Sequence, residues 1–145
     1  PERLGPIERI LAADKFVTAT GARIEHGGER AFYRPSTDHI QMPDEGLFCG
    51  TDTLSRDEGY YAVLLHELTH WTAPERRCNR DLSKRFLKAE VAAEELVAEI
   101  GAAMLCAELG VTHCLASGRE QPASYPSAHL DQGAPERFHP CQTAV

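Results

Sequence analysis

The chain has 145 residues, the size of one ordinary domain, and its 42% hydrophobic and 26% charged residues are typical of a globular protein. Its formal net charge of -7 argues against a dedicated nucleic-acid-binding domain, which normally carries an excess of basic residues. No run of about 18 apolar residues occurs, so we expect no transmembrane helix, and we see no signal-peptide pattern. Because the chain begins with Pro1, we expect a fragment or a processed product.

The cysteines argue against a disulfide framework. There are five of them, an odd number, with irregular spacing and no CxxC pair: Cys49, Cys78, Cys106, Cys114 and Cys141. Such a pattern favours a reducing compartment, so we expect the protein in the cytoplasm.

The N-terminal third predicts one helix and three short strands. Apolar residues recur at helical spacing over Ile7–Thr20, which is followed by a glycine suited to a helix end. Ala22–His26 and Arg30–Tyr33 are strand candidates, and the Gly27-Gly28 pair between them predicts a hairpin. With a third strand at Asp38–Met42, we expect a small antiparallel sheet. That third strand is either an ordinary sheet strand or an exposed edge able to pair with an extended peptide.

Two longer helices follow a loop over residues 44–54. Ser55 with Glu58 three residues later forms a capping-box pattern, so we expect a helix from about Arg56 to Thr72. Residues 75–88 carry six basic side chains and are interpreted as a solvated connection, with contact to an acidic partner or nucleic acid as the alternative. The last helix is expected at about Ala89–Leu109, because this segment is rich in strong helix formers.

The most informative motif is His66-Glu67-Leu68-Thr69-His70, an HExxH. Positions i and i+4 of a helix share one face, so both imidazoles can bind the same metal ion. Zinc is the expected ion, one per chain, since it takes neutral imidazole nitrogens and leaves a position for water. Glu67 is the expected catalytic acid/base.

The last helix offers the third ligand. Glu95 and Glu99 are four residues apart and share a face, so we predict Glu95 as the metal ligand and Glu99 as the partner of His66. Glu94 remains the alternative ligand. The Glu95 face is expected to continue through small residues towards the end of the helix, while three larger apolar residues face the core: Leu96, Ile100 and Met104.

These residues predict a zinc-dependent peptidase. The metal would activate water and polarise the carbonyl under attack, and the peptide would be cut into two fragments. Such sites usually include a donor to the developing oxyanion. The candidates for this or another substrate contact are Tyr33, His39, Tyr60 and Tyr61, among which the sequence does not choose.

The sequence resembles the zincin-like metallopeptidase domain of ArdC-type antirestriction proteins, which also occurs in polyvalent proteins of phages and conjugative elements. The resemblance covers about residues 5–111 and is carried by four stretches: RAFY at 30–33, STDHIQMP at 36–43, YYAVLLHELTHWT at 60–72, and AEELVAEIGAA at 93–103.

The resemblance implies an α+β zincin fold, in which the HExxH helix and the helix with the glutamate ligand pack on the small sheet. It implies zinc held by His66, His70 and Glu95, with Glu67 as the catalytic residue. Family members commonly carry an N-terminal domain that binds single-stranded DNA. We therefore expect a peptide or protein as substrate and DNA as a partner only through such a domain, outside this chain, in a protein of a mobile element.

We expect a metallopeptidase domain over residues 1–110 and an irregular tail over 111–145. The tail is rich in Pro, Ser and His, and it departs from the further helix that the family usually carries after Gly110. The alternative function is a catalytically silent module, stabilised by zinc, that acts by binding a partner alongside a separate DNA-binding domain.

Overall fold

The computed structural model describes residues 5–80 and 88–112. Their helices and strands follow one another in the order α1 (Leu11–Thr20), β1 (Arg23–His26), β2 (Phe32–Arg34), β3 (His39–Met42), the short 3-10 helix η1 (Glu45–Leu47), α2 (Arg56–Trp71) and α3 (Lys88–Leu109). The predicted tail lies almost wholly outside the described residues. The described chain is α+β, as the sequence predicted.

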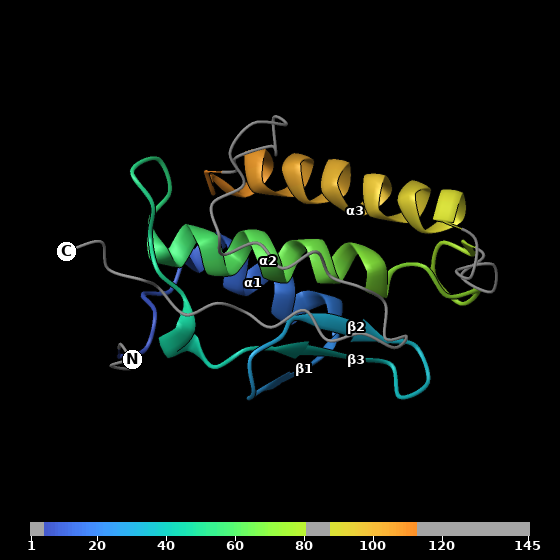
Figure 1. Cartoon of the computed structure of the whole chain (residues 1–145), viewed down its shortest axis with the longest axis horizontal. Coiled ribbons are helices and arrows are strands. Elements are labelled where there is room, and N and C mark those ends of the chain that lie inside the picture. Colours follow the sequence, from blue (N-terminus) through green and yellow to red (C-terminus); the bar gives the residue numbers. More distant parts are fainter. Residues whose placement is uncertain (1–4, 81–87, 113–145) are drawn as a thin grey trace.

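Helix α2 forms the middle layer of the molecule (Figure 1). It contacts α3 on one side and strands β2 and β3 on the other. Every residue from Tyr60 to His70 is therefore buried. The predicted capping box is confirmed, because the Ser55 hydroxyl accepts from the Glu58 N–H and the Glu58 carboxylate accepts from the Ser55 N–H. The HExxH motif thus lies inside the protein.

Helix α1 is shorter than predicted, since it begins at Leu11 instead of Ile7. Ile10 is extended, and contacts with the rest of the chain hold the residues before it. The Ile7 N–H donates to the Glu45 carboxylate at 3.2 Å, and Arg56 donates to the Pro6 carbonyl at 3.1 Å. These two hydrogen bonds hold the segment that we expected to form the first turn of the helix. The end of the helix is as predicted, with Gly21 in the left-handed region at φ 70°.

The sheet is mixed, so the prediction of an antiparallel sheet was wrong. Its strand order is β1-β3-β2, with β1 parallel and β2 antiparallel to β3. The chain does reverse at Gly27-Gly28, but β3 lies between the two strands that this turn joins. The Gly27 N–H donates to the Met42 carbonyl at 3.0 Å, which holds the turn against the end of β3.

Strand β3 is the central strand, so it is not the exposed edge considered above. Ile40 and Met42 on this strand are fully buried. A local turn signal shows where a chain reverses, but it does not show which strand fills the space between. As the central strand, β3 pairs its backbone with a neighbour on each edge, and it is the most buried of the three strands.

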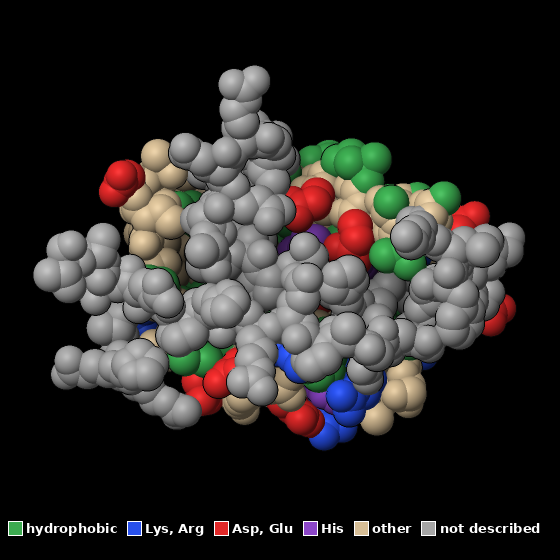
Figure 2. All heavy atoms as spheres, in the orientation of Figure 1, with side chains coloured by type: hydrophobic (Ala, Val, Ile, Leu, Met, Phe, Trp, Pro, Cys, Tyr) green, Lys and Arg blue, Asp and Glu red, His purple; other side chains and the backbone are tan. Residues whose placement is uncertain are grey.

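Helix α3 contacts α2 through its smallest side chains. Ala98, Ala102 and Cys106 are fully buried. Leu96, Ile100 and Met104, which we expected to face the core, are 60%, 51% and 69% exposed. Figure 2 shows hydrophobic side chains at the upper rim, over α3. Small residues at the contact bring the two helix backbones close, which is what lets the short Glu95 side chain reach the histidines of α2.

Gly101 tests this close approach. A Cβ built there would lie 2.6 Å from the Thr69 Cγ2 atom, whereas one at Gly59 in α2 would meet only the Leu54 side chain at 3.7 Å. Replacing glycine by alanine in a helix gains up to about 1 kcal/mol, but overpacking costs about 1–3 kcal/mol. We expect Gly101→Ala to lower the free energy of unfolding and Gly59→Ala to leave it unchanged or raise it. Urea denaturation of both variants checks this, and equal gains would contradict the packing described.

Candidate metal centre

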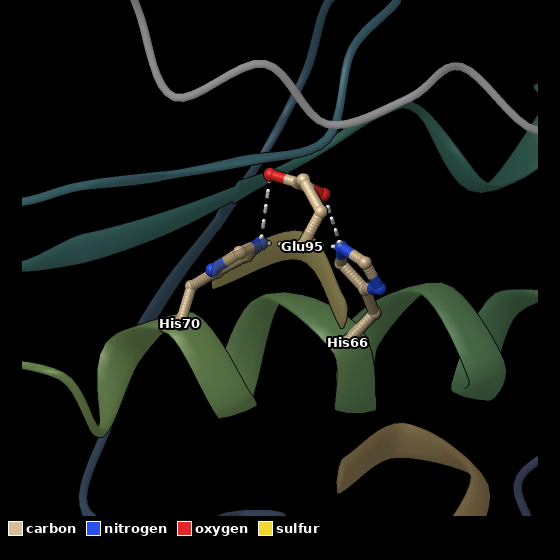
Figure 3. A group of neighbouring side chains, drawn as sticks. All are labelled: His66, His70 and Glu95. Atoms are coloured by element: carbon tan, nitrogen blue, oxygen red, sulfur yellow. Dashed lines mark hydrogen bonds and ion pairs between the residues drawn. The ribbon is translucent and has the colours of Figure 1, made fainter. Parts of the chain in front are cut away.

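His66 and His70 project from the same face of α2, one turn apart (Figure 3). Their Nε2 atoms lie 3.2 Å from each other. Both residues are buried, His70 completely. The HExxH spacing therefore produces the convergence of imidazoles that the sequence predicted.

Glu95 completes the cluster from α3. Its two carboxylate oxygens lie 3.4 Å from the His66 Nε2 atom and 3.5 Å from the His70 Nε2 atom. One ligand atom from each of the three residues lies within 4.8 Å of the others. The predicted ligand set is thus brought together by two helices that are adjacent in space.

Glu94 and Glu99 lie behind the imidazoles. The Glu99 carboxylate is 3.6 Å from the His66 Nδ1 atom, which has no hydrogen-bond partner among the described residues, so the role of Glu99 as the partner of His66 stays a prediction. Glu94, the alternative ligand, has its Oε1 atom 3.1 Å from the His70 Nδ1 atom, on the side of the ring away from Glu95. Glu94 is therefore the hydrogen-bond partner of His70, while Glu95 faces the ligand nitrogens. A carboxylate at Nδ1 favours the tautomer whose Nε2 lone pair is free to bind a metal.

The sequence analysis missed Arg80, which donates to both oxygens of Glu94 at 3.0 and 2.9 Å. The signal available was the basic segment 75–88, which was interpreted as a solvated connection. In the part of that segment that is described, its three arginines all pair with carboxylates of the same chain. Arg76 and Arg77 pair with Asp38, and Arg80 pairs with Glu94.

The electrostatics of the cluster favour a positive charge at its centre. Burial alone would lower the pKa of His70, but hydrogen bonds with Glu94 and Glu95 outweigh it and raise that pKa to about 10. Burial alone would raise the pKa of Glu95, but the two histidines lower it to about 2. Two imidazoles and a carboxylate aimed at one point are the donor set that zinc and similar divalent ions take, so the residues fit a bound metal.

Glu67 is the carboxylate of the HExxH motif. It is 1% exposed, and neither of its side-chain oxygens has a hydrogen-bond partner of ordinary geometry among the described residues. Burial raises the pKa of Glu67, and the nearby histidines and the main-chain amide of Tyr33 oppose that rise. A buried, unpartnered carboxylate is costly unless a ligand or substrate uses it.

The predicted substrate contacts are engaged elsewhere in this structure. The Tyr33 hydroxyl donates to Asp38 at 2.8 Å, and burial with this bond raises its pKa to about 12. The Tyr61 hydroxyl donates to Asp14 at 2.5 Å, and the His39 Nδ1 atom is 2.7 Å from the Thr37 hydroxyl. Tyr60 pairs with His26 at 2.8 Å. Each has a structural partner, and a role in substrate binding stays a prediction.

Asp38 joins the turn between β2 and β3 to the segment after α2. Burial alone would raise its pKa, but Arg77, Tyr33 and Arg76 lower it from 3.8 to about 2. Because the folded-state pKa is depressed, the stability it contributes is present above about pH 4 and is lost as the pH falls towards 2. We expect Asp38→Asn to have a lower free energy of unfolding than wild type at neutral pH, and we expect this difference to narrow below pH 4. Urea titrations from pH 7 to pH 3 measure the difference in free energy of unfolding. A difference that does not change with pH would refute the ion pairs.

Comparison with known protein families identifies the family to which this chain belongs. The sequence matches the zincin-like metallopeptidase family over residues 11–131, and the chain belongs to that family. The match extends past Gly110, where we expected the domain to end, so that boundary stays a prediction. Among the described residues, no helix is both long and apolar enough to cross a membrane.

Solved structures with the same fold include the antirestriction protein ArdC of plasmid R388. Its metal-free structure is 40% identical to this chain, with a TM-score of 0.58, over 80% of this chain and 40% of that one. Its Mn(II)-bound structure is 39% identical, with a TM-score of 0.57, over 77% of this chain and 39% of that one. A divalent metal is therefore bound by a protein of this fold.

Curated relatives are longer proteins. The uncharacterised protein y4eC of Sinorhizobium fredii is 49% identical over 88 residues, which are 61% of this chain and 27% of that protein. A DNA primase TraC of Escherichia coli is 45% identical over an aligned stretch of 101 residues that covers 64% of this chain and 9% of that protein. The chain thus spans about a quarter or less of these relatives.

Proposed function

We propose that this domain is a zinc-dependent peptidase that hydrolyses peptide bonds. The observation that carries the proposal is the convergence of His66, His70 and Glu95 beside the buried carboxylate of Glu67. A site built only for stability needs a complete set of ligands. It does not need an additional buried carboxylate without a partner next to them.

His66, His70 and Glu95 would hold the metal. When bound, a divalent metal lowers the pKa of water and polarises the carbonyl under attack. Zinc is our choice, because two imidazoles and a carboxylate with an open position are a common set for catalytic zinc, and such sites bind zinc more tightly than manganese. Mn(II), the ion found in the ArdC structure, is the alternative.

Glu67 would move the proton. Burial raises the pKa of Glu67, which makes its carboxylate a stronger base for the proton of water. It takes the proton of the attacking water and delivers it to the leaving amine. Glu67 lies on α2 between the two histidines, so the backbone that orients the imidazoles also holds the Glu67 carboxylate.

The biological setting would be protection of a mobile element against restriction by the host. The similarity to ArdC supports this proposal. The similarity to part of a DNA primase supports a role alongside other domains of a longer protein.

A peptide library derived from a cellular proteome tests the activity. We expect zinc-loaded protein to generate new peptide termini that carry one oxygen from labelled water, and chelation followed by removal of excess chelator to abolish them. If the loaded protein creates no new termini in a library that another zinc protease cuts under the same conditions, the peptidase proposal is contradicted.

A further inference from the structure

Arg80 lies where the chain returns to the end of α2. After Trp71 the chain turns back on itself, and the Arg80 N–H donates to the Ala73 carbonyl at 2.7 Å. This bond places the Arg80 side chain beside the last turn of α2. The Thr69 carbonyl of this turn accepts from the Thr72 N–H at 3.1 Å and from the Thr72 hydroxyl at 2.6 Å, and the turn carries the negative end of the helix dipole, which favours a cation.

The Arg80 guanidinium connects the two helices of the metal site. At the end of α2, its Nη2 atom donates to the Thr69 carbonyl and its Nη1 atom to the hydroxyl of Thr72, the residue after the helix, both at 2.8 Å. On α3, its Nε and Nη2 atoms donate to the two oxygens of Glu94. A paired fork of this kind fixes both the position and the plane of a carboxylate.

Glu94 passes this constraint to His70. The Oε1 atom that accepts from Arg80 is also the atom 3.1 Å from the His70 Nδ1 atom. Glu94 is 8% exposed and His70 is fully buried, so solvent offers little competition for either bond. The three side chains therefore form a continuous series of hydrogen bonds. It runs from Arg80 in the basic segment, through Glu94 on α3, to His70, the expected metal ligand on α2.

We propose that Arg80 and Glu94 are positioning residues that set the metal affinity of this site by holding His70 with its Nε2 atom towards Glu95. This proposal rests on the proposed metal site. Removing Arg80 would take away the two hydrogen bonds from its guanidinium that fix the Glu94 carboxylate, so we expect Glu94 to turn away from His70 towards water. The His70 ring then loses the bond that fixes its tautomer and its orientation.

Arg77 is a matched control. It comes from the same segment and donates to the carbonyl of Trp71 at the same helix end. Its carboxylate partner, however, is Asp38 in the turn before β3, with an Nη2–Oδ1 distance of 2.6 Å. Arg77→Gln thus removes a similar ion pair and a similar helix-end contact without touching the partner of His70.

The experiment measures the dissociation constant of Mn(II) by electron paramagnetic resonance, and of zinc by competition with a chromophoric chelator. We expect Arg80→Gln and Glu94→Gln to bind one ion with about 10- to 100-fold weaker affinity. Arg80→Lys keeps the charge without the fork, so it should fall between Arg80→Gln and wild type. Arg77→Gln should bind as wild type does. A purely structural role for Arg80 would lower the melting temperature and leave the affinity of the folded protein unchanged.

Folded Arg80→Gln with wild-type affinity overturns the proposal, and so does an equal loss in Arg77→Gln. If Arg80→Gln does not fold, Glu94→Gln decides by the same criterion. Wild-type protein that binds neither ion overturns this proposal together with the metal site. Wild-type protein that binds metal but cuts no peptide contradicts only the proposed activity, and the affinity measurements still decide the role of Arg80.

Discussion

Glu67→Gln should abolish peptide hydrolysis while the protein keeps its fold and its metal. Glutamine has nearly the same shape, but it cannot accept the proton of water. Loss of a general base typically costs about 100- to 10,000-fold in rate. The rate should be measured on the best-cleaved peptide of the library, beside circular dichroism and metal content of the same sample.

Glu108→Gln is the matched control, since Glu108 lies exposed near the end of α3. It should retain the wild-type rate. This pair of variants also separates the two functions considered for the chain. A binding module would show full partner binding in Glu67→Gln and no hydrolysis in wild type. A Glu67→Gln variant that cuts as fast as wild type would remove Glu67 from the mechanism.

Metal should raise the stability of wild-type protein but not that of His70→Ala. An ion that binds only the native state stabilises it by about 2.7 kcal/mol at a free concentration of 100 times the dissociation constant. His70→Ala loses a ligand, so the same metal concentration should give almost no gain. Thermal melts with added zinc and with chelator measure this difference.

His39→Asn serves as the control in those melts. His39 is also buried, but it lies on β3 with Thr37 as its partner. Its melting temperature should rise with metal as that of wild type does. An equal response in wild type and His70→Ala would show that the ion binds elsewhere or not at all.

The spacing of the metal-site residues within each helix could be predicted from sequence because that geometry is local. The HExxH spacing fixes the relation of His66 to His70 within one helix, and Glu95 and Glu99 share a face of the next helix for the same reason. The capping box and Gly110 mark where these helices begin and end. In each case the signal and the structure it specifies lie within a few residues.

The sheet could not be predicted because strand order is a long-range property. Gly27-Gly28 correctly marked a reversal of the chain, but nothing near it shows that β3 enters between the strands it joins. The faces of α3 were assigned wrongly for a related reason. Both of its faces are apolar, and the close approach required by Glu95 selects the alanines over Leu96 and Met104.

Arg80 was missed because a basic run gives no indication of which carboxylates it will meet. Its partner Glu94 is 14 residues away on another helix, and the contact depends on how the intervening chain returns. Glu94 itself was kept as the alternative metal ligand to Glu95. Which of these adjacent glutamates faces the histidines depends on the rotation of α3 about its axis. Only the packed structure fixes that rotation.

The most direct test of the metal centre is the metal content of tag-free protein, measured by mass spectrometry for wild type beside His66→Ala and Glu95→Ala. We expect one divalent ion per wild-type chain after loading and removal of excess metal, and none in either variant. Wild-type protein without metal after loading, or variants that retain as much as wild type, would contradict a centre formed by His66, His70 and Glu95.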